Sequence, residues 1–452
     1  MTANGYVLRV PADRRTTLQE GLELSDHVGE PVPRFDHPRG SPILVLLSFD
    51  DHQITHVADG RKGKSGGTGL VVLWLTAVEE LRSPVSFAHL VATAPSKVRR
   101  PLHARLQSGG LLAPKSLGAT VDALIELEPS IRERIARYSA RRIDTIRALP
   151  ERARENLAIQ KEQLNVALRM AGLDHEAVAL WSPPESGEVH SFLEGIKGPV
   201  GERTMIIGDA DIVPGFKLDG KDARNATKTF VRGTTRLSVT IASDQPLEQQ
   251  TGADLIYFNQ TYGSFVMVQY KTMRQAKWQG ADTHLYRPNS DKNLPEEIKR
   301  MDALNAVLGT ISPCGTLAGY RLNADPFYFK LCKRSDFDPD NTGLFGGMYL
   351  PLEYWKVLVK DPRTKGPRGG RAVGFENVGR KLSNSEFVQL VASGYIGSRV
   401  YQTSFINALI EQVLKEGKAI TLAVRDVVEL EGDTPPASDD GDDDDEDGDQ
   451  DI

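Results

Sequence analysis

The chain has little of what would hold a protein together covalently or place it in a membrane. It contains two cysteines in 452 residues, too few for a disulfide framework or a cysteine-based zinc site. Both Cys314 and Cys332 lie in or near apolar runs, so we expect buried free thiols. No apolar run approaches the ~20 residues that span a bilayer, and the N-terminus lacks a basic region followed by an apolar core. The sequence therefore predicts a cytoplasmic protein with no signal peptide and no membrane partner.

Sequence patterns for several common kinds of site are also missing. The nine histidines show no metal-ligand spacing such as His-x₃-His, and no Gly-x-Ser-x-Gly turn or Cys/His arrangement stands out for nucleophilic catalysis. Gly63-Lys64-Ser65 lacks the earlier glycine of a phosphate-binding loop, and no helix is predicted after it. Any catalytic site is therefore expected to use other groups.

The net charge hides an uneven distribution. Residues 439–452 contain ten Asp or Glu and no Lys or Arg, so that removing them changes the formal charge from −6 to +4. A run such as Asp442–Asp447 repels itself and cannot bury apolar area, which predicts a disordered acidic tail over 431–452. The tail is either a solubilising segment or a tethered polyanion that competes with nucleic acid for a basic groove.

A chain of this length should contain two or three domains. Residues 1–115 have strand-like runs at 43–49, 53–57 and 70–75, with a flexible basic Gly-rich loop at 59–69. A strand, a basic loop and a second strand are similar to small barrels that read nucleic acid, such as the PUA-like group. Residues 1–115 are therefore predicted to be a β-rich nucleic-acid-recognition domain, with a purely structural loop as the alternative.

Residues 116–187 are predicted to form a helical connector. Apolar residues recur at spacings of three and four at Leu124, Leu127, Ile131 and Ile135. A second helix is expected over Ala153–Ala171, ending at Gly172. The charges between the apolar positions favour solvated helix faces, and the Pro- and Gly-containing stretch 181–187 is predicted to be a domain boundary.

The remaining chain predicts an α/β organisation, with one domain at 188–335 and a mixed α/β region at 336–430. The predicted strands are 204–207, 228–231, 236–241, 255–258, 265–270 and 327–333. The predicted helices are 295–308, 385–393 and 404–416. The sequence as a whole therefore predicts a multidomain α/β protein.

The most informative pattern lies between residues 248 and 271. Asp254 opens a short apolar run, a turn follows at 259–264, and a second apolar run ends in Gln269-Tyr270-Lys271. This pattern is typical of a β-hairpin with polar groups at one end. Because strand side chains alternate between faces, Gln269 and Lys271 should share a face, and Tyr270 should point the other way.

An acid, an amide oxygen and an ammonium gathered at one sheet edge can support metal-assisted phosphodiester cleavage. Mg²⁺ prefers oxygen ligands, so Asp254 is the first candidate, followed by the Gln269 side-chain oxygen and the Tyr270 backbone carbonyl. Glu248 could bind the metal directly, through water or at a second position. Lys271 would orient or polarise the attacking water and offset charge on the phosphate.

These residues resemble the PD-(D/E)xK nuclease superfamily, in particular its Mrr-like and related Gln-x-Lys branches. Asp254 matches the first acid, Gln269 the Glu/Gln position, Lys271 the lysine and Glu248 an upstream acid. The resemblance implies a restriction-endonuclease-like mixed sheet flanked by helices over 188–335, and dependence on Mg²⁺ with Mn²⁺ as a substitute. It also implies cleavage of DNA in preference to RNA, in restriction or antiphage defence by analogy. Two departures are Ala in place of Pro before Asp254, and Gln in place of Glu, which is a weaker ligand.

Basic residues near this pattern and in Gly-rich segments are predicted to contact nucleic-acid phosphates, with an ordinary solvated surface as the alternative. They are Lys62, Lys64, Arg274, Lys277, Lys365 and Arg368. Two other functions remain open, a catalytically silent nucleic-acid-binding protein with a nuclease-like fold and an effector that a partner activates. A homodimer and a protein partner in a defence system are also left open.

Overall fold

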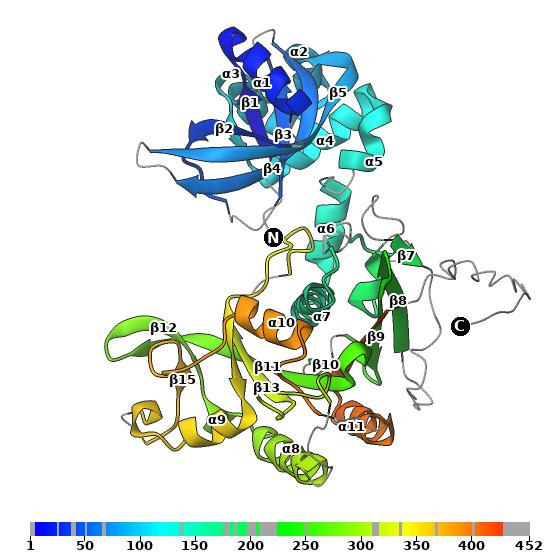
Figure 1. The fold of residues 1–452 in the computed structure, drawn as a ribbon. Helices are drawn as coiled ribbons and strands as arrows, with labels where there is room; N and C mark the ends of the chain where they lie inside the picture. The colour runs from blue at the N-terminus through cyan, green and yellow to red at the C-terminus, as the bar shows by residue number, and fades with distance from the viewer. Residues whose placement is uncertain are drawn as a thin grey trace, which may run out of the picture.

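The chain folds as a mixed α/β protein with two mixed β-sheets (Figure 1). The computed structural model describes residues 5–24, 27–37, 42–49, 52–65, 69–135, 138, 140–174, 178, 181–184, 188–196, 205–207, 224–247, 249–250, 253–309, 316–333, 337–366, 369–399 and 403–427. The predicted acidic tail therefore lies outside the described residues. Across the described ranges, no helix is both long and apolar enough to cross a membrane.

The first sheet has six strands in the order β2-β5-β4-β3-β1-β6. Its strands are β1 Gly5–Arg9, β2 His27–Pro33, β3 Ile43–Ser48, β4 Gln53–Ser65, β5 Leu70–Ser86 and β6 Gly110–Leu112. The accompanying helices are α1 Ala12–Leu24, α2 Phe87–Thr93, α3 Ser96–Ser108 and α4 Pro114–Leu127. The pairing order ends at β2 and β6 without closing in the described residues, so this part is an open α/β sheet and not the small barrel that was expected.

The predicted basic loop is mostly strand. β4 continues through Ser65 and pairs with β5, with Arg61 opposite Trp74. The prediction of a loop was therefore wrong over 59–65, and residues 66–68 lie outside the described part. Lys62 donates a hydrogen bond to the Phe35 carbonyl, and its ammonium lies 5.2 Å from the centre of the Phe35 ring. The Lys62 side chain thus packs β4 against the segment that follows β2.

The helices of residues 116–187 do not form a separate connector, because they divide between two hydrophobic cores. Leu117, Val121 and Leu124 of α4 pack with the first sheet, as does Tyr138. From Ile146 of α6 (Ala140–Ala148) onward, the buried residues belong to a core of the second sheet. α6 lies between the two sheets (Figure 1). Two short elements, the 3₁₀ turn Pro129–Ile131 and α5 Arg132–Ile135, precede it.

The expected boundary at 181–187 begins inside the second core. Trp181 is fully buried, and its indole N–H donates a 2.9 Å hydrogen bond to the Phe192 carbonyl. Its ring stacks on Phe192 and meets Phe337 edge-on. Residues 185–187 are outside the described part. The boundary prediction was therefore wrong at Trp181, which anchors the second core.

The second sheet has the strand order β14-β13-β11-β10-β16-β9-β8-β7, with β12 paired to β11 and β15 paired to β12. The strands are β7 Met205–Ile207, β8 Arg224–Arg232, β9 Thr235–Ser243, β10 Ala253–Asn259, β11 Ser264–Trp278, β12 Ala281–Tyr286, β13 Phe327–Lys333, β14 Gly347–Pro351, β15 Val373–Gly374 and β16 Ala419–Val427. The helices are α7 Glu151–Met170, α8 Leu294–Gly309, α9 Leu352–Leu358, α10 Asn384–Ala392 and α11 Thr403–Lys415. These elements confirm the predicted strands and helices of this region.

The C-terminal strand completes the middle of this sheet. β16 pairs in parallel with β10 and antiparallel with β9, and so lies between two strands that are close in sequence. β14 likewise pairs with β13. Residues 336–430 are therefore not a separate region from 188–335, because their strands and helices belong to the same sheet and its cores.

Helices cover both faces of the second sheet. On one face α7 contacts β9, β10 and β16, and α10 contacts α7 and β14. On the other face α8, α9 and α11 contribute Met301, Trp355 and Ile410 to the core. The covering explains why both faces of β10 and β11 are apolar at their centres.

The expected solvated face of the second predicted helix is instead buried in α7. Buried polar or charged residues on this helix are Asn156, Gln160, Lys161, Glu162, Gln163 and Asn165. Several of them have specific partners in the fold. Gln160 accepts a hydrogen bond from the Phe192 N–H, and the Thr421 hydroxyl donates to Gln163. The polar residues of α7 therefore connect the helix to β16 and to neighbouring loops.

Candidate functional site

The predicted hairpin is present, and it brings two of the predicted side chains together. β10 and β11 are antiparallel, and the register sets Asp254 directly opposite Gln269. The Gln269 amide donates to an Asp254 carboxylate oxygen at 3.5 Å. Both side chains are buried. The turn contains Gly263 in the left-handed conformation, with φ of 56°, which glycine adopts without steric cost.

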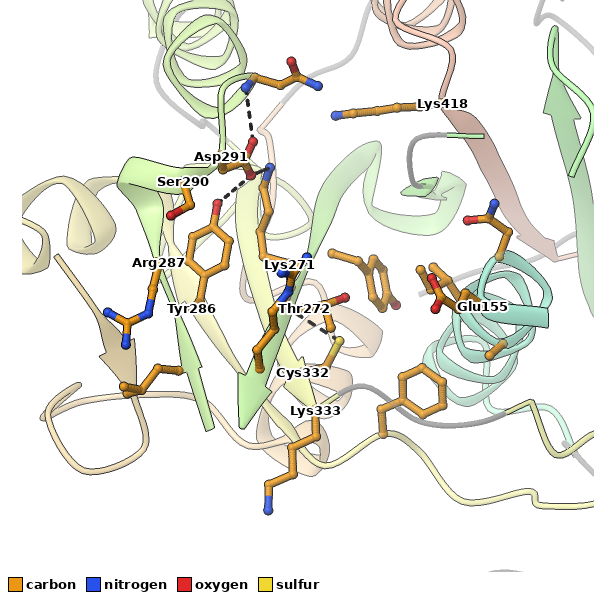
Figure 2. A pocket seen from close by; sticks show the side chains of 18 of the residues that line it. Glu155, Lys271, Thr272, Tyr286, Arg287, Ser290, Asp291, Cys332, Lys333 and Lys418 are labelled. Atoms are coloured by element: carbon orange, nitrogen blue, oxygen red, sulfur yellow. Dashed lines mark hydrogen bonds and ion pairs between the residues drawn. The ribbon is translucent and has the colours of Figure 1, made fainter. Parts of the chain in front are cut away.

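Lys271 lies on the same face of β11, two residues beyond Gln269. Its ammonium donates to Glu297 at 2.5 Å and to Asp291 at 2.7 Å. Asp291 also accepts a hydrogen bond of 2.6 Å from the Tyr286 hydroxyl. Figure 2 shows Lys271, Tyr286 and Asp291 converging at this point. The lysine is therefore fixed by two carboxylates from the segment between β12 and α8 and from the first turn of α8.

A second lysine enters the cluster from the C-terminal strand. Lys418, immediately before β16, places its ammonium 2.5 Å from Glu297 and 3.3 Å from Asp254. Glu416 lies 3.6 Å from the same nitrogen and also pairs with Arg300. Register brings Lys418 here, because Asp254 of β10 is aligned with Ile420 of β16. One ammonium thus connects the hairpin acid with the helix acid.

The three carboxylates of the cluster respond differently to burial. Burial raises the pKa of Asp254, and the attraction of Lys418 does not fully offset it. Burial also opposes ionisation of Glu297, but Lys271 and Lys418 outweigh it and lower the pKa of that carboxyl. Burial is likewise outweighed at Asp291, where hydrogen bonds from Lys271 and Tyr286 lower the pKa. Asp254 is therefore the acid whose charge the fold compensates least.

These residues open onto a cleft of about 840 Å³. The cleft is formed by α7, β11, the segment around Asp291 and Lys418 just before β16, and Figure 2 shows Glu155 of α7 across from Tyr286 and Arg287. Seven basic residues line it, against four acidic ones. The basic residues are Arg152, Lys271, Arg274, Arg287, Lys292, Lys333 and Lys418. The acidic residues are Glu155, Asp254, Asp291 and Glu297. The lining therefore has an excess of positive charge suited to a polyanion.

The other two predicted metal ligands are Glu248 and Tyr270. Glu248 lies outside the described residues. Tyr270 directs its side chain to the opposite face, where the Lys330 ammonium lies 5.5 Å from the ring centre. That orientation agrees with the prediction that the Tyr270 side chain points away from Gln269 and Lys271, and the proposed role of its backbone carbonyl stays a prediction.

The predicted nucleic-acid contacts separate into two groups. Arg274 lines the cleft. Lys277, further along β11, and Lys365, in an isolated bridge with Arg371, are exposed but lie outside the described lining. Lys62 is bonded to Phe35 in the first sheet. The Lys64 side chain and Arg368 lie outside what the structure describes.

The residues that the sequence did not reveal are Asp291, Glu297 and Lys418. Glu297 has the position of an ordinary acidic residue in the first turn of a helix that begins near a proline. Lys418 is 164 residues from Asp254, and the two meet only because β16 inserts beside β10. The weak signal available was the glycine-lysine pair directly before an apolar strand.

The donor set is compatible with a hard divalent cation. The Gln269 side-chain oxygen is buried and accepts no hydrogen bond from the described residues. Asp254 and Glu297 supply two carboxylates that already share one cation, the Lys418 ammonium. Two carboxylates and an amide are oxygen ligands of the kind that Mg²⁺ binds. A cluster of three or more His, Cys, Asp or Glu side chains arranged to hold a metal is not found among the described residues.

Comparisons with protein-family models, with curated proteins and with solved structures found no match to this chain.

Proposed function

We propose that the protein is a Mg²⁺-dependent nuclease of the PD-(D/E)xK type, with DNA favoured over RNA as substrate and a restriction-endonuclease-like arrangement of its second sheet. The observation that carries the proposal is the placement of Asp254 opposite Gln269, with Lys271 on the same face at the wall of a basic cleft. This is the arrangement expected from the Asp and Gln-x-Lys pattern of the sequence.

Each residue has a role that follows from its chemistry. Asp254 and the Gln269 oxygen would hold the metal, with Glu297 within reach from α8. Mg²⁺ supplies Lewis-acid activation of the phosphodiester and of the attacking water. Lys271 would direct a proton-donating ammonium toward the phosphoryl oxygens or the water, and Asp291 and Glu297 fix its position. The hydrogen bond from Tyr286 in turn fixes Asp291.

The cleft supports a nucleic-acid substrate over a small neutral one. Phosphate contacts supply most of the affinity of proteins for nucleic acid, and they come chiefly from Arg and Lys. Arg274, Arg287 and Lys292 line the cleft close to the cluster. A role in restriction or antiphage defence rests on analogy with the resembled family alone, and a homodimer or an activating partner is compatible with it.

One observation favours a second function, a catalytically silent nucleic-acid-binding protein. In this structure Lys271 and Lys418 form ion pairs with the carboxylates that a metal would use. A permanent ion-pair cluster of this kind would stabilise the fold and leave the cleft as a binding surface. Metal-dependent cleavage decides between the two functions.

The test compares the wild type with Lys271→Ala on supercoiled plasmid, single-stranded DNA and RNA, each with Mg²⁺, Mn²⁺ or EDTA. We expect cleavage with either metal, none in EDTA, and a loss of about 10²–10³-fold in Lys271→Ala, the usual effect of removing one charge-stabilising donor. Lys356→Ala is the matched control, because Lys356 forms ion pairs with Asp302 and Glu353 away from the cleft. Its activity should equal that of the wild type.

Cleavage that persists in EDTA or in Lys271→Ala would contradict the site assignment. A wild type that cleaves none of the substrates but binds them would support the silent nucleic-acid-binding protein.

A further inference from the structure

We infer that the Lys418 ammonium occupies the place between Asp254 and Glu297 that a divalent cation takes when it binds, and that Glu297 is the third protein ligand of that cation. This inference deepens the proposed function and rests on its metal site. It assigns roles to two residues that the Asp and Gln-x-Lys pattern does not include.

The first support is geometric. Lys418 lies 3.3 Å from Asp254 and 2.5 Å from Glu297, so both carboxylates are held against one positive charge. All three side chains are less than a tenth exposed. Beside them, the Gln269 oxygen is buried without a hydrogen-bond donor from the described residues. The Gln269 nitrogen now faces Asp254, so a rotation of the amide by half a turn would present this third oxygen to a cation bound to the carboxylates.

The second support is the balance of charge. Asp254, Asp291 and Glu297 face the two ammoniums of Lys271 and Lys418, which leaves one net negative charge when all are ionised. Replacing the Lys418 ammonium by a divalent cation makes the cluster neutral. Buried charge is costly unless it is compensated, so the exchange improves the compensation of the acids.

A third observation is that the Lys418 ammonium has an alternative ion-pair partner if a cation displaces it. Lys418 follows Gly417, whose φ of 70° lies in the left-handed region, and it lies immediately before β16 at the wall of the cleft. Glu416 lies 3.6 Å from its ammonium and is more exposed than Asp254 or Glu297. A flexible four-carbon side chain can therefore leave the two acids and stay paired at the rim of the cleft.

The exchange has a direct consequence for metal affinity. A cation that must displace Lys418 binds more weakly than one that meets free carboxylates. Lys418→Met keeps the length of the side chain and removes its charge, so we expect its Mn²⁺ dissociation constant to be at least tenfold lower than that of the wild type. Adding Glu297→Gln to Lys418→Met should raise the constant again by at least tenfold.

The experiment measures Mn²⁺ binding to the full chain by calorimetry and by electron paramagnetic resonance, and thermal unfolding with and without Mn²⁺. Mn²⁺ should raise the unfolding temperature of Lys418→Met more than that of the wild type. Lys330→Met is the matched control, because Lys330 is also buried and, within the described part of the chain, is ion-paired with the single acid Glu162. Mn²⁺ should raise its unfolding temperature no more than that of the wild type.

A measurement on the wild type covers the case in which Lys418→Met does not fold. Lysine acetylation read by mass spectrometry should show Lys418 slow to react without metal and several-fold faster with Mn²⁺, while Lys330 stays unchanged. Unchanged Lys418 labelling when Mn²⁺ binds, equal Mn²⁺ affinity in Lys418→Met and wild type, or no Mn²⁺ binding would each overturn the inference. Because none of these readouts needs cleavage, metal exchange in a protein that cuts nothing would uphold the inference and contradict only the nuclease proposal.

Discussion

Two buried lysine clusters lie on opposite faces of the second sheet, and they differ in how completely their charges are matched. On one face, Lys330 of β13 pairs with Glu162 of α7. The second oxygen of Glu162 accepts a 2.9 Å hydrogen bond from the Phe345 N–H. On the other face, Lys271 and Lys418 form ion pairs with three carboxylates at the wall of a cleft.

The first cluster is closed and balanced. Lys330 is completely buried, and its ammonium also lies 4.9 Å from the centre of the Tyr349 ring. Burial opposes its charge, but Glu162 outweighs that effect and raises the pKa of Lys330. The Asp254 cluster has one carboxylate more than it has ammoniums, and burial raises the pKa of Asp254. The closed pair is therefore matched within the fold, whereas the open cluster has one carboxylate in excess, which the proposed exchange of the Lys418 ammonium for a divalent cation would compensate.

The largest effect on the free energy of unfolding is expected when the Lys330–Glu162 ion pair is broken. Lys330→Met leaves Glu162 buried without its ammonium, and removal of one partner of a buried ion pair costs about 3–5 kcal/mol. Lys271→Met should cost roughly 1–3 kcal/mol, because Glu297 keeps Lys418 and Asp291 is partly exposed. Urea denaturation followed by circular dichroism measures both unfolding free energies. Equal losses, or a larger loss in Lys271→Met, would remove the distinction between the clusters.

A smaller effect concerns the cleft beside the open cluster. Arg274 lines it, and Lys277 on the same strand lies outside its described lining. Arg274→Ala should weaken DNA binding about tenfold and lower the salt dependence by about one phosphate contact. Lys277→Ala should change affinity less than twofold. Fluorescence anisotropy over a salt series measures both, and equal effects of the two variants would show that DNA follows a different path.

The smallest effect isolates the charge of Asp254. Because burial raises the pKa of Asp254 in the folded state, that state holds its proton more tightly than the unfolded chain does. Asp254 therefore lowers stability as the pH rises from the unfolded pKa through the folded one. Asp254→Asn removes this dependence. At pH 8 the free energy of unfolding of the variant should therefore equal that of the wild type or exceed it by up to about 1 kcal/mol. Unfolding free energies at pH 4 and pH 8 test this, and a variant clearly less stable than the wild type at pH 8 would show that Lys418 outweighs burial.

Local patterns predicted much of the second sheet. The apolar runs around 255–258 and 265–268 and the turn between them predicted the β10–β11 hairpin, and the structure adds the register that sets Asp254 opposite Gln269. The helix at α8 followed from its proline-containing start. These features depend on residues that are close in the sequence, so their spacing alone determines which side chains share a face.

Contacts between residues that are far apart in the sequence could not be predicted from local patterns. The polar residues of α7 have the spacing of a solvated helix, but Glu162 and Gln163 are buried because Lys330 and Thr421 meet them. Trp181 stands in a Pro-rich segment and still anchors a core. Lys418 joins the site through the insertion of β16 between β9 and β10, a pairing that no local pattern specifies.

The most direct test of the metal site is an anomalous-scattering map from a crystal of the full chain grown with Mn²⁺. We expect one strong peak about 2 Å from oxygens of Asp254, Gln269 and Glu297, with the Lys418 ammonium moved toward Glu416. A Mn²⁺ peak elsewhere, or a cluster with Lys418 still between Asp254 and Glu297 at saturating Mn²⁺, would contradict this expectation.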